Sequence, residues 1–409
     1  MTQPDDLGPA RSAEPPAESL HADTRAIRGG RGANGSSLAP VLWATSAFVT
    51  PDSATAQRMA STIGASEFYG RYGNPTVCAF ESAMADMEGA EAARAFSSGM
   101  GAVSAVLFGL VSAGDHIVTQ KQLYGGTQLL FNAVCPRFNI DVTYVDATDP
   151  DAWEAAIRPG KTMLCFAETP SNPRLSMVDL ERFGRIAGPV TVVDSTFATP
   201  IGQRPLDHGV DLVLHSATKS IAGHNDATIG VVAGERDLID WLWGFAVLHG
   251  ANASPFDAMN AIRGLRTLPI RHERQSATAQ ALAEFLEAHP AVESVSFPGL
   301  PSFAQFELAK RQLTMPGGLI TFDVAGGIAA GRAFVEGTTI AQMATSLGGP
   351  ETLVTHPATT THAGLLPEEM AEAGIGDGTI RMSVGLEHPG DLIADLSRAL
   401  DLAARARAH

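Results

Sequence analysis

Short apolar stretches alternate with segments of helical spacing from about residue 76 to residue 234, and this alternation restricts the fold more than any other feature. Strands are predicted over residues 92–96, 116–119, 140–145, 163–167, 190–193, 212–214 and 228–233. Helices are predicted between them, among others over 76–87, 125–134, 151–157 and 180–187. Because parallel strands need a crossover connection, which is usually a helix, this order indicates a mostly parallel sheet with helices on both faces. We therefore expect an α/β fold.

The pattern changes after about residue 265. A long helix is predicted over 274–288, followed by short strands near 292–296 and 319–324 and a helix over 328–336. This mixture predicts a smaller α+β domain. We expect four segments: a disordered tail at 1–20, rich in Pro, Ala, Asp and Glu; an N-terminal arm at 21–75; a large domain at 76–265; and the α+β domain at 266–409.

Composition and charge exclude several kinds of partner. The 409 residues carry a formal net charge of -16, which argues against a broad surface for nucleic acid or an anionic membrane. The longest apolar run, 101–113, is too short to span a bilayer, and the first 20 residues have no apolar core of a signal peptide. The cysteines are odd in number and far apart, which suits reduced thiols rather than a disulfide framework or a zinc site: Cys78, Cys135 and Cys165. We expect a cytoplasmic protein without a metal.

One lysine stands out by its position. Of the 28 Lys and Arg residues only four are lysines: Lys121, Lys161, Lys219 and Lys310. Lys219 follows the apolar stretch 210–214 and is the only Lys or Arg between Arg204 and Arg236. Lysine can lose its proton when desolvated and then attack a carbonyl group, whereas arginine cannot. Lys219 is therefore a candidate nucleophile, although a structural role is more common for a single buried lysine.

Three polar clusters follow predicted strands, at the edge of a doubly wound sheet where ligands bind. They are 97–101 (Ser-Ser-Gly-Met-Gly), Asp194 and 215–219 (His-Ser-Ala-Thr-Lys). Taken singly, the first is most often an ordinary helix cap and the second a turn cap. Taken together, they offer a helix start for a phosphate, a carboxylate for a ring nitrogen and an amine for a carbonyl. Pyridoxal 5'-phosphate (PLP) matches all three, because its protein complement is an Asp–pyridinium pair and a lysine Schiff base.

Longer stretches around these clusters resemble the Cys/Met-metabolism PLP-dependent enzymes, which include cystathionine synthases and lyases, methionine γ-lyases and homoserine-ester sulfhydrylases. The resemblance extends from about residue 20 to the end, and its motifs are 69–76 (YGRYGNPT), 98–100 (SGM), 124–127 (YGGT), 168–173 (ETPSNP), 193–200 (VDSTFATP), 216–220 (SATKS), 223–226 (GHND), 346–349 (SLGG), 356–359 (HPAT) and 381–387 (RMSVGLE). It implies the fold of type I PLP-dependent transferases, with a seven-stranded sheet. It also implies a homotetramer built from catalytic dimers, in which the N-terminal arm reaches the neighbouring subunit.

The resemblance implies roles for individual residues. Lys219 would hold PLP as a Schiff base and carry protons, Asp194 would pair with the ring nitrogen, and Tyr124 would stack on the ring and move protons at the substrate's γ-position. The phosphate would be held by Gly99, Met100, Ser216 and Thr218, while Tyr69 and Arg71 would reach the phosphate in the neighbouring subunit. The carboxylate of an amino-acid substrate would be bound by Arg381, Asn172 and the backbone of Ser346.

The implied chemistry removes protons from Cα and Cβ and then expels the γ-substituent. The resulting vinylglycine-type intermediate either takes up a nucleophile (γ-replacement) or is hydrolysed to 2-oxobutanoate and ammonia (γ-elimination). Three departures concern the substrate: Gly126 stands where methionine γ-lyases have Cys, an apolar residue near Ala246 where they have Lys, and Thr345 where cystathionine enzymes usually have Glu. Ser220, Ile221 and Asn225 also differ from the usual residues close to the cofactor, whereas 355–362 is most like homoserine-ester sulfhydrylases.

We therefore predict γ-replacement or γ-elimination on a homoserine-derived or sulfur-containing amino acid, of the O-succinyl- or O-acetylhomoserine sulfhydrylase kind. The alternative is a methionine or cystathionine γ-lyase, or a γ-substitution with an unusual nucleophile. A PLP binder without catalysis is disfavoured by the joint presence of Asp194, Lys219, Tyr124 and Arg381. A nucleotide-binding protein is disfavoured because 97–101 lacks a P-loop lysine.

Overall fold

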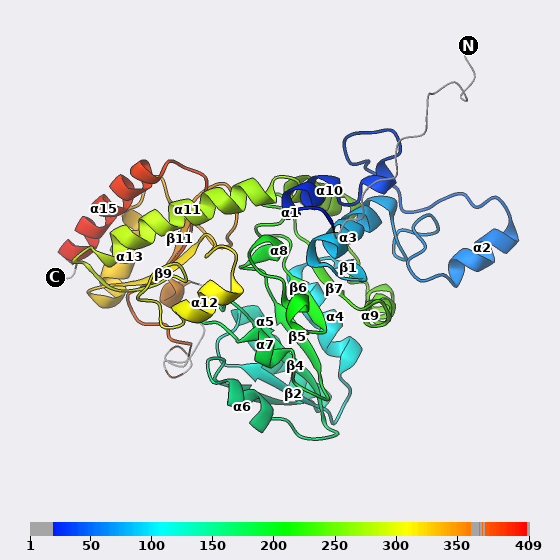
Figure 1. Ribbon diagram of the computed structural model, residues 1–409, viewed down its shortest axis with the longest axis horizontal. Coiled ribbons are helices and arrows are strands. Elements are labelled where there is room, and N and C mark those ends of the chain that lie inside the picture. Colours follow the sequence, from blue (N-terminus) through cyan, green and yellow to red (C-terminus); the bar gives the residue numbers. More distant parts are fainter. Residues whose placement is uncertain (1–18, 361–367, 369, 371–372, 407–409) are drawn as a thin grey trace, which may run out of the picture.

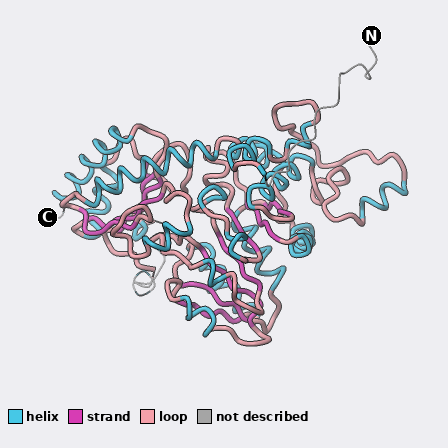
Figure 2. Tube along the Cα trace, in the orientation of Figure 1, coloured by secondary structure: helices cyan, strands magenta, loops and turns pink. Residues whose placement is uncertain are grey.

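The structure, a computed structural model, describes residues 19–360, 368, 370 and 373–406. The tail predicted at 1–20 lies almost wholly outside these residues, and so do Thr361 and His362 of the stretch 355–362. Two β-sheets occupy separate halves of the molecule, as the magenta strands in Figure 2 show. The first sheet belongs to the central part of the chain and the second to its C-terminal part.

The large sheet has seven strands in the order β1-β7-β6-β5-β4-β2-β3. Their bounds are β1 Ala92–Phe96, β2 His116–Gln120, β3 Asp141–Val145, β4 Thr162–Glu168, β5 Val190–Asp194, β6 Leu212–His215 and β7 Gly230–Gly234. All neighbours are parallel except β7, which runs antiparallel to both β1 and β6. The predicted α/β fold with a mostly parallel seven-stranded sheet is confirmed.

Helices cover both faces of this sheet (Figure 1). On one face α4 (Gly99–Leu110) and α9 (Arg236–His249) share a core with Val192, Leu212 and other strand residues. On the other, α3 (Pro75–Glu88) and α10 (Pro255–Leu265) pack on Val213 and its neighbours, while α6 (Pro150–Ala155) and α7 (Leu180–Phe183) pack nearer β2 and β4. The central strands thus have apolar side chains on both faces, which is why most of their residues are apolar.

One predicted helix is shorter than its pattern suggests. The helix expected over 180–187 ends at Phe183 as α7. Gly184 follows directly and lies against the loop at His208, where a Cβ atom would meet the His208 carbonyl oxygen at 2.2 Å. This close approach of two backbone segments is a tertiary constraint that helical spacing does not reveal.

The smaller sheet has five strands in the order β10-β11-β12-β9-β8. Their bounds are β8 Val292–Ser296, β9 Leu319–Val324, β10 Gln342–Met343, β11 Leu353–Thr355 and β12 Thr379–Ser383. It shares a core with α11 (Leu268–Glu287), α13 (Gly327–Gly337) and α15 (Pro389–Ala406), and α12 (Phe306–Gln312) lies nearer the large domain. Helix α11 joins the halves, because Leu268 belongs to the large-domain core and Leu286 to the small one.

The N-terminal segment has one part that packs on the body and one that extends from it. Helix α1 (Ala22–Arg28) packs on α3, and at Gly30, with φ 69°, a Cβ atom would lie 2.1 Å from the Ala79 carbonyl oxygen. Further along, α2 (Ser53–Ala60) projects away from the two sheets in Figure 1. Apolar side chains such as Val49, 98% exposed, lie in this projecting part. An arm that covers another subunit would expose them in this way, and the oligomeric state stays a prediction.

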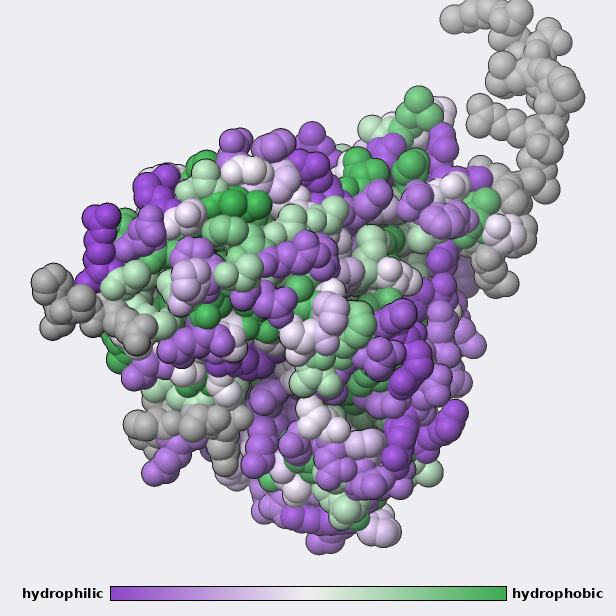
Figure 3. Space-filling view, turned by 60° about the vertical axis from the view of Figure 1, so that its left-hand side comes forward, coloured by the Kyte–Doolittle hydropathy of each residue, from purple (hydrophilic) through white to green (hydrophobic). Residues whose placement is uncertain are grey.

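The face in Figure 3 mixes hydrophilic residues, which predominate over the large domain, with smaller hydrophobic patches. Within the described ranges, no helix combines the length and the apolar character needed to cross a membrane.

Candidate active site

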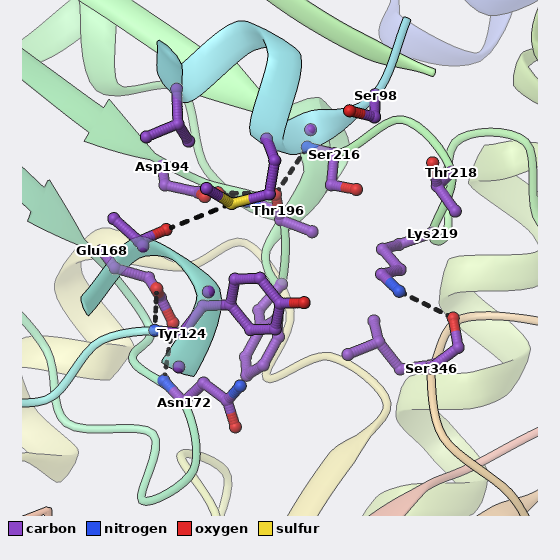
Figure 4. Close-up of a pocket in the computed structure, with 18 of the residues that line it drawn as sticks. Ser98, Tyr124, Glu168, Asn172, Asp194, Thr196, Ser216, Thr218, Lys219 and Ser346 are labelled. Carbon is purple, nitrogen blue, oxygen red and sulfur yellow. Dashed lines mark hydrogen bonds between the residues drawn. The ribbon is translucent and has the colours of Figure 1, made fainter. Parts of the chain in front are cut away.

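A cavity of about 510 Å³ lies where the carboxyl ends of β4, β5 and β6 face the small domain. Every predicted site residue except Tyr69 and Arg71 lines it: Gly99, Met100, Tyr124, Asn172, Asp194, Ser216, Thr218, Lys219, Ser346 and Arg381. Figure 4 shows several of these side chains converging from different elements. Parallel strands end on the same edge, so residues far apart in the sequence meet there.

The start of α4 forms one wall. Ser98 is the N-cap residue, and its hydroxyl oxygen accepts a 2.9 Å hydrogen bond from the Gly101 N–H group. The first N–H groups of a helix have no partner inside the helix, so they can bind an anion. A Cβ atom on Gly99 would lie 2.7 Å from Cβ of Ser216, so only glycine lets α4 begin this close to the loop after β6. Ser216 and Thr218 lie on that loop and line the same part of the cavity, where their hydroxyl groups can donate to an anion.

Asp194 ends β5 and is buried. Its Oδ1 accepts hydrogen bonds from the N–H group of Thr196 at 3.0 Å and from the Thr196 hydroxyl at 2.5 Å. Burial raises the pKa of the Asp194 carboxyl, while the Thr196 hydrogen bonds and the charge of His215 oppose this. His215 itself is fixed by buried Glu88, 2.5 Å from its Nε2. A buried carboxylate at the sheet edge is suited to a cationic partner such as a protonated ring nitrogen.

Lys219 lies on the same loop, opposite the small domain. Its amine donates a 2.7 Å hydrogen bond to the hydroxyl oxygen of Ser346. Burial, together with the charge of Arg381, lowers the pKa of Lys219 to about 8. A minor but appreciable fraction of the amine is therefore neutral near physiological pH, and the neutral form is the one that attacks a carbonyl.

Arg381 lies in the middle of β12 and is buried. Its guanidinium group donates to the side-chain oxygen of Asn172 at 3.2 Å and to the carbonyl oxygen of Ser346 at 3.1 Å. Ser346 has φ 81°, which is uncommon for a residue other than glycine. In this conformation its hydroxyl meets Lys219 while its carbonyl meets Arg381. The buried guanidinium fork can bind a carboxylate in two-point fashion.

Tyr124 precedes α5 (Gly125–Leu129) and is half exposed to the cavity. Figure 4 shows its ring extending from the Glu168 side of the cavity toward Lys219. Its ring lies against Gly126, where a Cβ atom would be 2.5 Å from the ring carbon Cε1. The ring position therefore depends on the absence of a side chain at residue 126.

Tyr69 and Arg71 do not line this cavity. They lie in the N-terminal segment, where the Arg71 guanidinium carbon is 5.5 Å from the Tyr69 ring centroid and its Nη1 donates to the Val247 carbonyl oxygen at 2.8 Å. Tyr69 is 43% exposed. Their predicted contact with the phosphate in a neighbouring subunit stays a prediction.

Two residues of the site received no role from the sequence. Thr196 orders Asp194, and its hydroxyl oxygen also accepts a 2.8 Å hydrogen bond from the Ser216 N–H group. Glu168 lines the cavity beside Asp194 and is buried. Both belong to motifs that carry the family resemblance, 193–200 and 168–173, so the sequence indicated that these positions lie near the site. Their contacts depend on tertiary structure.

PLP fits the residues present. The α4 N-terminus and the hydroxyls of Ser216 and Thr218 can hold its phosphate, Asp194 its ring nitrogen and Lys219 its aldehyde carbon, all within one cavity. The Cβ-free approach at Gly99 leaves the helix start accessible. Fold and site together define a PLP-dependent enzyme.

Comparison with known proteins identifies the family. The family model described as Cys/Met metabolism PLP-dependent enzyme matches residues 23–401. The chain is 46% identical to the L-methionine gamma-lyase of Porphyromonas gingivalis over 92% of this chain and 96% of that one. It is 43% identical to the O-succinylhomoserine sulfhydrylase of Pseudomonas aeruginosa, over 92% and 94%. The crystal structure of metB from Corynebacterium glutamicum matches with a TM-score of 0.88 and 34% identity, over 94% of this chain and 99% of that one. The chain belongs to the Cys/Met metabolism PLP-dependent enzyme family.

Proposed function

We propose that the protein is a carbon–sulfur lyase that catalyses γ-elimination on an amino acid with a neutral thioether γ-substituent, with L-methionine as the first candidate. Several of the similar relatives are L-methionine gamma-lyases. These relatives favour the lyase alternative over the sulfhydrylase reaction that we placed first from the sequence.

The small number of cationic side chains in the cavity is the main support for this proposal. Among the described residues that line it, Lys219 and Arg381 are the only Lys or Arg side chains. Arg381 is placed to bind the α-carboxylate and Lys219 to bind the cofactor, so a second acidic group on the substrate finds no cation within one subunit. O-Succinylhomoserine and cystathionine carry such a group, and burying an unpaired charge is costly. Methionine carries no such group, and the apolar side chains of Val103 and Leu347 are part of the lining.

Each residue of the cavity has a separate role in the proposed reaction. Bound PLP supplies the electron sink that lets the Cα proton leave. Arg381 and Asn172 bind the substrate carboxylate, which orients the Cα–H bond. Lys219, with its pKa near 8, accepts that proton, moves it away from Cα and then removes a proton from Cβ, whose electron pair can expel the γ-substituent, while the Ser346 hydroxyl holds the amine in place. Tyr124 can give a proton to the leaving sulfur as the Cγ–S bond breaks. Water then completes the reaction, which yields methanethiol, 2-oxobutanoate and ammonia.

Substrate comparison tests the proposal. The purified holoenzyme is given L-methionine, and 2-oxobutanoate and methanethiol are measured by mass spectrometry. In parallel it receives O-acetylhomoserine or O-succinylhomoserine with sulfide, and homocysteine is measured. A higher kcat/KM for methionine supports the lyase, whereas homocysteine formation from O-succinylhomoserine as the fastest reaction overturns both the lyase proposal and its charge argument.

A second candidate is γ-replacement by sulfide on a neutral O-acylhomoserine. One observation favours it: Gly126 stands at the position of the cysteine found in methionine γ-lyases, and the Tyr124 ring occupies the space of its side chain. The O-acetylhomoserine arm of the same experiment detects this activity. It is the preferred reaction if homocysteine forms faster than 2-oxobutanoate.

A further inference from the structure

Glu168 is a buried acid at the edge of the active site without a role in the chemistry described above. It ends β4, is only 4% exposed and lies opposite Asp194 of β5 in the strand register. Two buried carboxyl groups at the ends of adjacent strands cost free energy, because both are removed from bulk water and repel each other when ionised. The site therefore uses this carboxyl group for something that an apolar residue could not supply.

Each oxygen of Glu168 accepts one hydrogen bond from the backbone. Oε2 accepts from the N–H group of Tyr124 at 2.8 Å, and Oε1 accepts from the N–H group of Asn172 at 2.7 Å. Both contacts appear as dashed lines in Figure 4. One side chain thus joins the segment that carries the Tyr124 ring to the segment that carries a substrate-binding amide.

Glu168 is itself held rigidly. Its N–H group donates to Oε1 of Gln120 at 3.0 Å, and its carbonyl oxygen accepts from Nε2 of Gln120 at 2.9 Å. Gln120 belongs to β2, the next strand of the sheet. The backbone from which the carboxyl group extends is therefore fixed by the sheet and not by the segments that the carboxyl group contacts, which is what a positioning group requires.

The contact between Glu168 and the backbone of Asn172 also influences the position of the substrate-binding arginine. Asn172, whose backbone Glu168 holds, accepts a hydrogen bond from Arg381 through its side chain. Burial and the charge of Asp194 raise the pKa of Glu168, although the two N–H groups and Arg381 favour its ionised form. Its oxygens can accept both backbone hydrogen bonds in either charge state.

We propose that Glu168 is a positioning residue that fixes Tyr124 and the Asn172–Arg381 carboxylate site at a set separation, so that both ends of the bound amino acid are aligned by one side chain. This inference rests on the family's amino-acid substrate and deepens the proposed function. It does not depend on which γ-substituent leaves.

The test replaces one of the two hydrogen-bond-accepting oxygens of Glu168 and keeps the size of the side chain. In Glu168→Gln the amide oxygen can accept from only one of the two N–H groups, and the NH₂ group faces the other. A lost buried hydrogen bond of this kind corresponds to about 10- to 100-fold in binding or rate. We expect kcat/KM for the best substrate to fall by about this factor, with KM raised and kcat lowered together. We also expect L-alanine, which has no γ-substituent to lose, to bind more weakly to the holoenzyme in an absorbance titration of the cofactor.

Glu81 provides a matched control. It is another buried carboxyl group that accepts a backbone hydrogen bond, from Ala95 at 2.9 Å, and it pairs with Arg94, but it does not line the cavity. Glu81→Gln is expected to lower stability while L-alanine affinity and kcat/KM stay within about twofold of wild type. An equal kinetic loss in both variants would mean that general destabilisation, not positioning, explains the effect, and the inference would be wrong.

A double-mutant cycle provides the second readout. If Glu168 acts through Asn172, Glu168→Gln costs clearly less in an Asn172→Ala background than in wild type. Additive losses contradict the inference. Where Glu168→Gln fails to retain cofactor, Glu168→Asp, whose shorter side chain cannot span both N–H groups, is measured in the same way, and wild-type L-alanine binding by it also contradicts the inference.

The L-alanine titration separates this inference from the proposed function. Weaker alanine binding in Glu168→Gln supports the positioning role even where methionine is not turned over, in which case only the lyase proposal fails. Unchanged alanine binding overturns the positioning role whatever the reaction.

Discussion

The amine of Lys219 is hydrogen-bonded at 2.7 Å to the hydroxyl of Ser346, a residue of the other half of the molecule. Lys219 follows a strand of the large sheet, whereas Ser346 lies between two strands of the small one. The same serine accepts a hydrogen bond from Arg381 through its carbonyl oxygen. The proposed cofactor-binding amine and the proposed carboxylate-binding fork are thus aligned by one residue, so the relative position of the two domains directly affects the chemistry.

Replacing Lys219 with Ala should abolish covalent cofactor attachment. The visible absorbance of the purified holoenzyme should be lost, and kcat should fall by about 10²- to 10⁴-fold, the usual contribution of a positioned proton-transfer group. Lys310→Ala is the control, since Lys310 is an exposed residue of α12. A coloured, fully active Lys219→Ala protein would exclude Lys219 as the attachment site.

The pH dependence of cofactor uptake should report the Lys219 amine. Burial and the charge of Arg381 lower its pKa to about 8, so the amine is mostly protonated below pH 8 and mostly neutral above it. Only the neutral form attacks an aldehyde. The rate at which apoenzyme gains visible absorbance with PLP should therefore rise with pH and have its midpoint near 8. A midpoint above 10, the range of an exposed lysine, would show that Lys219 is not desolvated.

Arg381→Lys should show whether substrate binding needs the planar guanidinium group of Arg381 or only its positive charge. The variant keeps a cation but loses the planar fork that contacts Asn172 and Ser346 at 3.2 and 3.1 Å. We expect KM for the amino-acid substrate to rise and kcat/KM to fall by about 10- to 100-fold, while the cofactor absorbance is retained. Arg158→Lys, at an exposed ion pair with Asp141, should leave both unchanged.

The sequence was enough for the large sheet and for the residues at its edge, because both depend on local features. Apolar runs predicted the seven strands; Asp194 ends one of these strands, and Lys219 lies on the loop that follows another. Ser346 and Arg381 came only from the family resemblance, because nothing local connects them to Lys219. The three-residue strand β11 is too short to give a pattern, although it pairs with the strand of Arg381.

The role of Glu168 could not be predicted for a different reason. Its motif was visible, but its function depends on which two N–H groups its oxygens reach, and those belong to residues 124 and 172. The antiparallel direction of β7 could not be predicted either, since the apolar run at 228–233 has the same composition whether it pairs in a parallel or an antiparallel way. Contacts between distant segments decide such features.

Gly126→Ala should move the Tyr124 ring. The added Cβ atom would lie 2.5 Å from ring carbon Cε1, so the half-exposed ring must shift while the fold stays intact. Since Tyr124 is proposed to transfer a proton to the leaving group, its displacement should lower kcat by about 10-fold or more, with little change in thermal stability. Gly244→Ala in α9 is the control, because nothing lies within 4 Å of a Cβ there. An unchanged kcat would show that the ring position in the structure is not the one used in turnover.

Arg271 should set the stability of the loop that follows Lys219. Its guanidinium group is buried and donates to the carbonyl oxygens of Ser220 at 2.8 Å and Gly264 at 2.7 Å. Burial lowers the pKa of Arg271 to about 10, so the group is still cationic at neutral pH. Lysine cannot reach both carbonyl oxygens with one compact ammonium group, which leaves a buried acceptor without a partner.

We expect Arg271→Lys to reduce the free energy of unfolding by about 2–3 kcal/mol, measured by urea denaturation of the holoenzyme. It should also lower kcat, because the loop that carries Lys219 becomes less well fixed. Arg263→Lys, at an exposed position of the neighbouring helix α10, is the control and should change the stability by less than about 0.5 kcal/mol. Arg271 hydrogen-bonds to the loop through backbone carbonyl oxygens. An Arg271→Lys protein as stable as wild type would mean that these hydrogen bonds are replaced by water, and that the loop is held by the packing of Ile221 and Ala222 instead.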